Sequence, residues 1–180
     1  MNEIIIKKMK NLNIIKRLNE KENSKRLIES TLNIKYEDLS FNEFNKPFLN
    51  DDIHFNVSHS KGYIGIAIYS SSIGFDLEVE RKVNNNLINK IYNEVDLKVN
   101  QKDNILKVFT IKEAYLKALG IGLKYDFKNI IIDYDKFIVK YKDYETMYFK
   151  TYKINDIIFS VVTKDNTTFS ISLEDLNEKM

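Results

Sequence analysis

Two apolar runs joined by a serine turn are the strongest constraint that this sequence places on its fold. Residues 63–69 and 73–79 consist mainly of β-forming residues, and Ser70-Ser71-Ser72 separates them. Aromatic and β-branched side chains pack well on a pleated surface, so both runs are predicted to be strands. Later apolar or alternating runs predict further strands at residues 130–139, 146–154, 157–163 and 168–172.

Two other segments have helical patterns. Residues 11–32 place apolar side chains at helical spacing near their end, which predicts a single or broken helix. Asp103 or Asn104 can cap a second helix, which runs to Leu119 and ends at Gly120. A helix with strands therefore occurs twice, on either side of residues 83–86. We predict an α+β chain of two similar halves, residues 1–84 and 85–180, although no sequence repeat is visible.

The composition excludes several classes of protein. The 180 residues are 43% hydrophobic, which is enough to build a core. The net charge of only +2 gives no overall attraction to nucleic acid or to a membrane surface. The absence of cysteine excludes disulfides and thiolate metal sites and fits a reducing cytosol. With no secretory signal pattern and no run of about 20 apolar residues, a soluble cytoplasmic protein is expected.

Acidic residues alternate along the predicted strand at 73–79. Asp76 and Glu78 are two residues apart, so both side chains point to one face of the strand. Adjacent carboxylates repel each other unless a cation or basic groups lie between them, which makes a metal site one interpretation. A solvated strand face is the alternative, and Glu80 continues the same alternation.

Phe109, Glu113 and Lys117 recur every four residues in the second predicted helix and so share a face. An ordinary Glu–Lys pair, which stabilises a helix by about 0.2–0.5 kcal/mol, explains this spacing as well. The functional interpretation makes Glu113 a third metal ligand. It places Lys117 one turn further along, against a phosphate.

Two more segments carry polar groups ahead of these strands. Residues 54–60, His-Phe-Asn-Val-Ser-His-Ser, are predicted to be a polar loop that could hold an anion, or else a turn of self-bonding serines. The chain has only 2 histidines, too few for a zinc site, and the adjacent Ser58 and His59 cannot form a hydrolase triad by themselves. In Asn45-Lys46-Pro47, a basic group stands beside a rigid proline, and a solvated turn lysine is the alternative.

In this order, the four segments resemble the Sfp-type 4′-phosphopantetheinyl transferases, which activate carrier proteins of peptide, polyketide and fatty-acid synthesis. The family motifs are a Gly-Lys-Pro-like loop, a Phe-Asn-x-Ser-His-Ser segment, a Gly-x-Asp-x-Glu strand and a Trp-x-x-Lys-Glu-x-x-x-Lys helix. They correspond here to residues 45–47, 55–60, 74–78 and 109–117. The resemblance runs from about Glu20 to the C-terminus. It implies two similar α+β halves with the active site in the cleft between them.

The resemblance also implies a reaction and its cofactors. Phosphopantetheine would move from coenzyme A to a serine of an apo acyl or peptidyl carrier protein, with release of 3′,5′-ADP. Asp76, Glu78 and Glu113 would bind Mg²⁺, with Mn²⁺ as a second possibility, and Glu113 is the first candidate for the base. Lys117 would contact the pyrophosphate of the coenzyme. Because both halves of the site come from one chain, a monomer is expected.

The adenosine and 3′-phosphate of the coenzyme would be held by residues that match the family on the N-terminal side. These are Arg26, Lys46 and His59, with Ser58 nearby. Basic residues at Lys112, Lys117 and Lys124 would help to recruit an acidic carrier protein, unless they only form a solvated helix face.

The sequence departs from the family at several positions. Phe109 replaces a tryptophan, and Asn45 replaces a glycine, although asparagine tolerates positive φ better than most residues. Asp96 lies roughly where many members have a glutamate proposed as a base. The first strand of the family is expected to be missing or replaced by residues 1–19.

Two other functions stay open at this point. A degenerate protein could bind coenzyme A or a carrier without catalysis, but the three carboxylates and Lys117 are all retained, which argues against it. A metal-dependent hydrolase of phosphate esters could use the same acids. That function leaves the Lys46 loop and the Ser-His-Ser segment unexplained.

Overall fold

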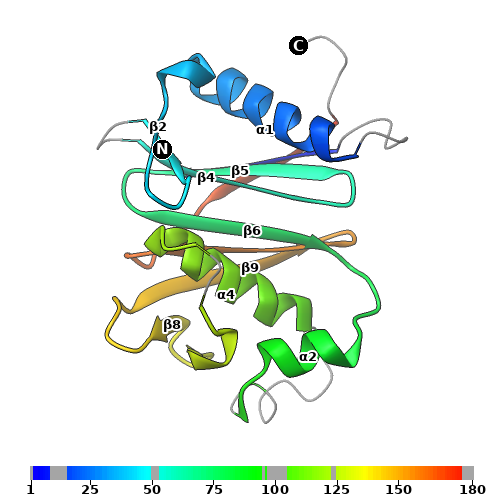
Figure 1. The fold of residues 1–180 in the computed structure, drawn as a ribbon, viewed down its shortest axis with the longest axis vertical. Coiled ribbons are helices and arrows are strands. Elements are labelled where there is room, and N and C mark those ends of the chain that lie inside the picture. The colour runs from blue at the N-terminus through cyan, green and yellow to red at the C-terminus, as the bar shows by residue number, and fades with distance from the viewer. Residues whose placement is uncertain are drawn as a thin grey trace.

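The computed structural model describes residues 2–8, 16–49, 53–94, 96, 105–122 and 125–175. Figure 1 shows two sheets stacked on each other, with helix α1 on the outer side of one and helix α4 on the outer side of the other. The described elements thus form four layers, in the order helix, sheet, sheet, helix. This mixture of helices with largely antiparallel sheets confirms the predicted α+β class.

The described strands form two main sheets and one short pair. The first sheet has the order β11 (Ser170–Asp175), β1 (Glu3–Lys8), β5 (Tyr63–Tyr69), β4 (His54–Ser60). The second has the order β6 (Ile73–Val79), β10 (Ile157–Thr163), β9 (Met147–Ile154), β8 (Ile138–Tyr141), β7 (Ile130–Asp133). The remaining elements are α1 (Lys16–Leu32), η1 (Tyr36–Asp38), β2 (Ser40–Phe41), β3 (Pro47–Phe48), α2 (Asn85–Ile91), α4 (Ile105–Leu119) and η2 (Phe127–Asn129).

Three apolar clusters hold the four layers together. Leu27 and Ile28 of α1 pack on one face of the first sheet. Ile4 and Ile6 of β1, both completely buried, lie in the cluster between the two sheets. The third cluster joins α4 to the second sheet. No helix in the described part of the chain has both the length and the apolar character needed to cross a bilayer.

The two strands predicted around the serine turn are confirmed, with the predicted bounds. They belong to different sheets, however, so the serine turn carries the chain from the first sheet to the second. Residues 1–19, which were expected to replace the first strand of the family, contain a strand that was not predicted, β1. β1 pairs in parallel with β11 and antiparallel with β5, and its alternate isoleucines fill the core between the sheets.

Two other strand predictions need correction. Residues 54–60, predicted to be a loop, form the edge strand β4. Residues 130–139, predicted as one strand, are divided between β7 and β8, which pair with each other. The turn between them forms because Asp133 Oδ1 accepts the backbone N–H groups of Asp135 and Lys136 and Phe137 has a φ of 55°.

Gly74 determines how closely α4 approaches β6. A Cβ atom at this position would lie 1.8 Å from the carbonyl oxygen of Ala114 and 2.5 Å from the backbone nitrogen of Ala118. As predicted, α4 ends at Gly120, which has a φ of +70°. The predicted cap at Asp103 or Asn104 and residues 11–15 of the first predicted helix lie outside the described residues.

The sheets exchange strands across residue 84. β6 precedes this residue but pairs with β10, whereas β11 follows it and pairs with β1. The division into residues 1–84 and 85–180, and the similarity of the two halves, stay predictions.

Candidate active site

β4 and β6 are edge strands of different sheets, and alternate side chains of β4 reach across to β6. Ser58 Oγ donates to Asp76 Oδ1 at 2.7 Å, and Ser60 Oγ donates to Glu78 Oε2 at 2.6 Å. Asn56 Oδ1 accepts the backbone N–H of Phe75 at 2.9 Å. The polar residues of the Ser-His-Ser segment therefore form a seam between the sheets, in which both serine hydroxyls orient carboxylates.

Asp76 lies at the centre of this seam and is 5% exposed. Its Oδ1 accepts from Ser58 and, at 2.6 Å, from the ammonium of Lys117. Its Oδ2 is buried and has no hydrogen-bond partner among the described residues. Burial raises the pKa of Asp76 above its ordinary value, and the positive charge of Lys117 offsets part of that rise. One oxygen of this carboxylate is thus held in place while the other is left for a ligand.

Glu113 projects from α4 toward the same acidic residues and is 7% exposed. Burial, and then repulsion by the Asp76 and Glu78 carboxylates, raises the pKa of Glu113 to about 7, although Lys117 and Lys90 act against the rise. The side chain of Glu113 forms no hydrogen bond or ion pair with any other residue that the structure describes. The predicted strand and the predicted helix thus bring their carboxylates close enough to interact electrostatically.

Glu78 and Lys117 already have partners within the protein. Both terminal nitrogens of Arg81 contact the Glu78 carboxylate, forming an ion pair that the sequence analysis did not foresee. The Lys117 ammonium donates to Ser58 Oγ, to the carbonyl oxygen of Phe75 and to Asp76 Oδ1. Lys117 therefore neutralises Asp76 directly, and a phosphate would approach a cation that is already oriented.

The chemistry of these acids fits a hard divalent cation. Mg²⁺ takes oxygen ligands and is usually bound by one or two carboxylates, with waters and substrate phosphates completing its shell. In the described part of the site, Asp76 Oδ2 has no hydrogen-bond partner, and the Glu113 carboxylate has no hydrogen bond or ion pair to another described side chain. Within that part, no three acidic or histidine side chains form a ready-made metal cluster. Two carboxylates are nevertheless sufficient for such a cation.

A basic depression lies beside the carboxylates, at the start of α2. Its volume is about 440 Å³, and residues 81–84, 86, 87 and 90 line it. Two of its lining residues interact with the carboxylates: Arg81 forms the ion pair with Glu78, and the charge of Lys90 acts on Glu113. The combination of acids and a neighbouring basic depression suits a cation together with a negatively charged substrate.

Lys46 lies on the turn between β2 and β3, where Asn45 has the positive φ, 60°, that was expected to be tolerated there. Its ammonium donates to the carbonyl oxygens of Lys117 at 2.7 Å, Ile73 at 3.1 Å and Ala118 at 3.4 Å. Burial lowers the pKa of Lys46 to about 8. All three of its N–H donors are thus directed at backbone carbonyls.

Arg26 belongs to α1, and His59 lies on the face of β4 opposite to that of Ser58 and Ser60. Arg26 is exposed, and its Nε donates to Glu22 Oε1 one helical turn earlier. His59 Nδ1 lies 3.8 Å from Glu20 Oε2, which also belongs to α1. Among the described residues, neither Arg26 nor His59 contacts the carboxylates of the candidate site, Asp76, Glu78 and Glu113. Their predicted role at the coenzyme stays a prediction.

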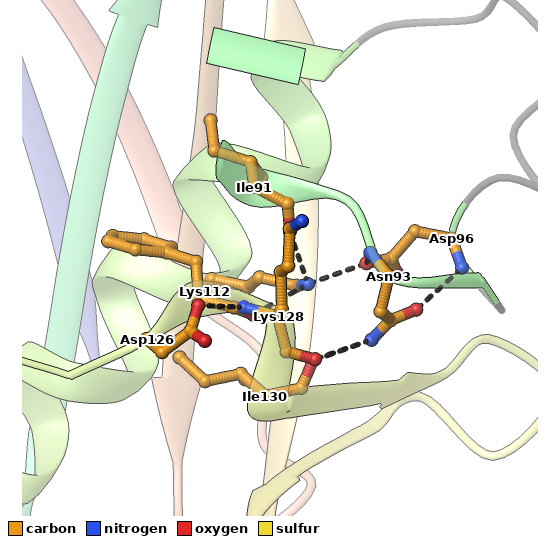
Figure 2. A network of polar contacts seen from close by, with 8 residues as sticks. Ile91, Asn93, Asp96, Lys112, Asp126, Lys128 and Ile130 are labelled. Atoms are coloured by element: carbon orange, nitrogen blue, oxygen red, sulfur yellow. Dashed lines mark hydrogen bonds and ion pairs between the residues drawn. The ribbon is translucent and has the colours of Figure 1, made fainter. Parts of the chain in front are cut away.

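Figure 2 shows a buried ion pair that the sequence analysis missed, on another side of α4. The Lys112 ammonium donates to Asp96 Oδ2 at 2.5 Å and to the carbonyl oxygens of Ile91 and Phe127 at 2.9 Å each. Asn93 exchanges hydrogen bonds with Asp96. Both charged side chains are 0% exposed, so Asp96 is sequestered in this network. Burial lowers the pKa of Lys112, and Asp96 offsets part of that fall.

The burial of Lys112 corrects one expectation. A completely buried ammonium cannot attract a carrier protein at the surface, so the proposed recruiting role of Lys112 is wrong. Lys124 lies outside the described residues. Lys112 precedes Glu113 and so points to a different side of the helix from the Phe109–Glu113–Lys117 face. Its burial depends on contacts with Ile91, Asp96 and Phe127, which no local sequence pattern signals.

Two kinds of comparison relate this chain to known proteins. A family model described as the 4′-phosphopantetheinyl transferase superfamily matches residues 72–171. The 4′-phosphopantetheinyl transferase gsp of Aneurinibacillus migulanus is 31% identical over 156 residues, which cover 76% of this chain and 66% of that protein. The 4′-phosphopantetheinyl transferase Sfp of Bacillus subtilis (strain 168) is 28% identical over 112 residues, covering 54% and 50%. The matched part of these curated relatives is thus between half and two thirds of their length.

Proposed function

The chain belongs to the 4′-phosphopantetheinyl transferase superfamily, and from this membership we propose that it transfers phosphopantetheine from coenzyme A to a serine of an apo acyl or peptidyl carrier protein, releasing 3′,5′-ADP. The observation that carries the proposal is the set formed by the buried Asp76 and Glu113 and the partly buried Lys117 where β6 meets α4. It combines oxygens for a divalent cation with a cation for a phosphate. We further propose that the enzyme acts as a cytoplasmic monomer.

Asp76 and Glu113 would hold Mg²⁺, or Mn²⁺ in its place, with Glu78 at the edge of the set. When bound, the cation supplies positive charge to the diphosphate of the coenzyme. Lys117, already fixed against Asp76, would contribute a second positive charge where the leaving diphosphate becomes more negative. Glu113 is the candidate that accepts the serine proton, since the described residues offer it no competing hydrogen-bond donor.

The coenzyme itself would lie across the outer side of the seam. Arg26 and His59 are proposed to face its 3′-phosphate, and their side-chain exposures of 57% and 44% support that availability. Ser58 and Lys46 were also expected to lie near the coenzyme. That expectation stays a prediction, and both side chains have internal partners.

The test incubates the protein with an apo carrier, coenzyme A and Mg²⁺ and then weighs the carrier by mass spectrometry. We expect the mass to increase by one phosphopantetheine, with no increase when EDTA is present. Asp76→Asn should abolish the transfer, whereas Asp143→Asn, at an exposed position of equal charge, should not. Coenzyme binding without modification would instead identify a degenerate binding protein. Phosphate release from simple esters would identify a hydrolase.

A further inference from the structure

Lys46 connects the two elements that carry the acidic site. Its ammonium contacts the first residue of β6, through the carbonyl oxygen of Ile73, and the last turn of α4, through the carbonyl oxygens of Lys117 and Ala118. β6 carries Asp76, and α4 carries Glu113 and Lys117. One side chain therefore bridges the strand and the helix whose relative position determines the geometry of the site.

The end of α4 needs such a partner. The last four carbonyl groups of a helix have no intrahelical donor, and they carry the negative end of the helix dipole. The N–H of Gly120 serves Leu116 and Lys117, and Ser72 Oγ donates to the carbonyl oxygen of Ala118 at 2.7 Å. A partly buried cation at this end is favourable electrostatically and gives the carbonyl oxygens of Lys117 and Ala118 a further donor.

The turn that presents Lys46 is itself fixed to the same place. Asn42 Oδ1 accepts the backbone N–H groups of Phe44 and Lys46, and Asn42 Nδ2 donates to the carbonyl oxygen of Gly120 at 2.9 Å. The β2–β3 turn thus contacts the helix end through two side chains. This arrangement distinguishes Lys46 from a solvated turn lysine.

We propose that Lys46 is a positioning residue, which holds the last turn of α4 against β6 and thereby sets the location of Lys117 relative to Asp76. The link is short: the carbonyl oxygen of Lys117 accepts from Lys46, while the ammonium of Lys117 donates to Asp76. Because all three N–H donors of Lys46 are engaged by carbonyls, the coenzyme is not needed to explain this lysine. The kinetic part of the proposal rests on the proposed transferase function.

The test compares wild type with Lys46→Met, which keeps an unbranched apolar stem of similar reach, and with Lys46→Arg, which keeps the charge. Lys140→Met, at an exposed position on β8, is the matched control. For Lys46→Met we expect kcat to fall about 10- to 100-fold, as when other positioning partners are removed, with less than about a threefold change in KM for coenzyme A. Lys46→Arg should recover part of kcat, and Lys140→Met should leave both constants unchanged.

Hydrogen exchange gives a second readout that requires no catalysis. In Lys46→Met, amides in a peptide covering residues 116–122 should exchange at least tenfold faster, while those of β10 should be unaffected. A tenfold or greater rise in KM for coenzyme A with unchanged kcat and exchange would overturn the proposal and assign Lys46 to the coenzyme. Unchanged kinetics and exchange would also overturn it.

Failure of the proposed transferase function can be distinguished from failure of the positioning role of Lys46. If wild type transfers nothing to a carrier, the proposed function fails, but the exchange comparison still decides whether Lys46 holds the helix end. If Lys46→Met does not fold, Lys46→Gln, which keeps a donor on a shorter side chain, is measured in the same way. Faster exchange at residues 116–122 in that variant would support the proposal, and exchange equal to wild type would overturn it.

Discussion

Replacing Glu113 by glutamine is expected to stabilise the metal-free protein above neutral pH. Burial and the neighbouring carboxylates raise the pKa of Glu113 from 4.5 to about 7. Between these values the folded protein keeps a proton that the unfolded chain has already lost, so the free energy of unfolding decreases as the pH rises through this window. Above pH 7 the carboxylate is ionised in both states, and the penalty is constant.

The size of this penalty follows from the shift. One pKa unit corresponds to 1.36 kcal/mol, so ionised Glu113 costs the folded state about 3 kcal/mol above pH 7. Glu113 is only 7% exposed, so solvent screens little of this energy. Glutamine has the same shape and no charge. Glu113→Gln should therefore be about 3 kcal/mol more stable than wild type at pH 8 and about equally stable at pH 4.

The assay is urea unfolding of both proteins in EDTA at a series of pH values from 4 to 8. The difference between their unfolding free energies should grow between about pH 4.5 and pH 7, because only wild type has the Glu113 carboxyl, whose ionisation destabilises the folded state in that range. Glu94→Gln, at an exposed position, controls for the loss of one negative charge. A Glu113→Gln protein that is no more stable than wild type at pH 8 would refute the reasoning. So would a difference that does not change with pH, since that would indicate an effect of packing.

Two further substitutions test how α4 is held. Gly74→Ala places a methyl group 1.8 Å from the carbonyl oxygen of Ala114, so we expect a loss of about 3 kcal/mol in urea unfolding together with loss of transfer. Near-normal stability would mean that α4 can move aside. Lys112→Met leaves Asp96 buried and unpaired, which should cost about 3–5 kcal/mol. Adding Asp96→Leu to that variant should recover part of this loss, and a double variant less stable than Lys112→Met would contradict the pairing.

Part of the fold could be predicted because its signals are local. The bounds of β5 and β6 follow from uninterrupted apolar runs, and the end of α4 follows from Gly120. β1 was missed because a short isoleucine run beside lysines gives a weak signal. Its stability comes from β5 and, in parallel, from β11, whose residues lie more than 160 positions later in the chain. Such pairing depends on tertiary contacts that no local pattern contains.

The side chains of the candidate site could likewise be predicted only where a local pattern places them. That Asp76 and Glu78 share a face follows from the two-residue period of a strand, and that Glu113 and Lys117 share a face follows from helical spacing. The ion pair of Arg81 with Glu78 could not be foreseen, because it depends on how the chain turns after β6. The use of Lys46 at the end of α4 likewise depends on a contact between residues 71 positions apart.

The side chains of β4 explain why β6 can carry acidic residues at the edge of the second sheet. β6 is an edge strand, and an edge strand presents unpaired backbone groups. Asn56 Oδ1 accepts from Phe75 N, and Ser60 Oγ accepts from Val79 N at 3.4 Å, so side chains of β4 take the place of a neighbouring strand. Polar residues at alternate positions of β4 are needed for this, and they gave residues 54–60 the composition of a loop. Ser60, together with Ser58, also orients the carboxylates: Ser58 donates to Asp76 and Ser60 donates to Glu78. The side chains of β4 thus complete the edge of the second sheet in place of a further strand, and they hold the carboxylates of β6 in fixed positions.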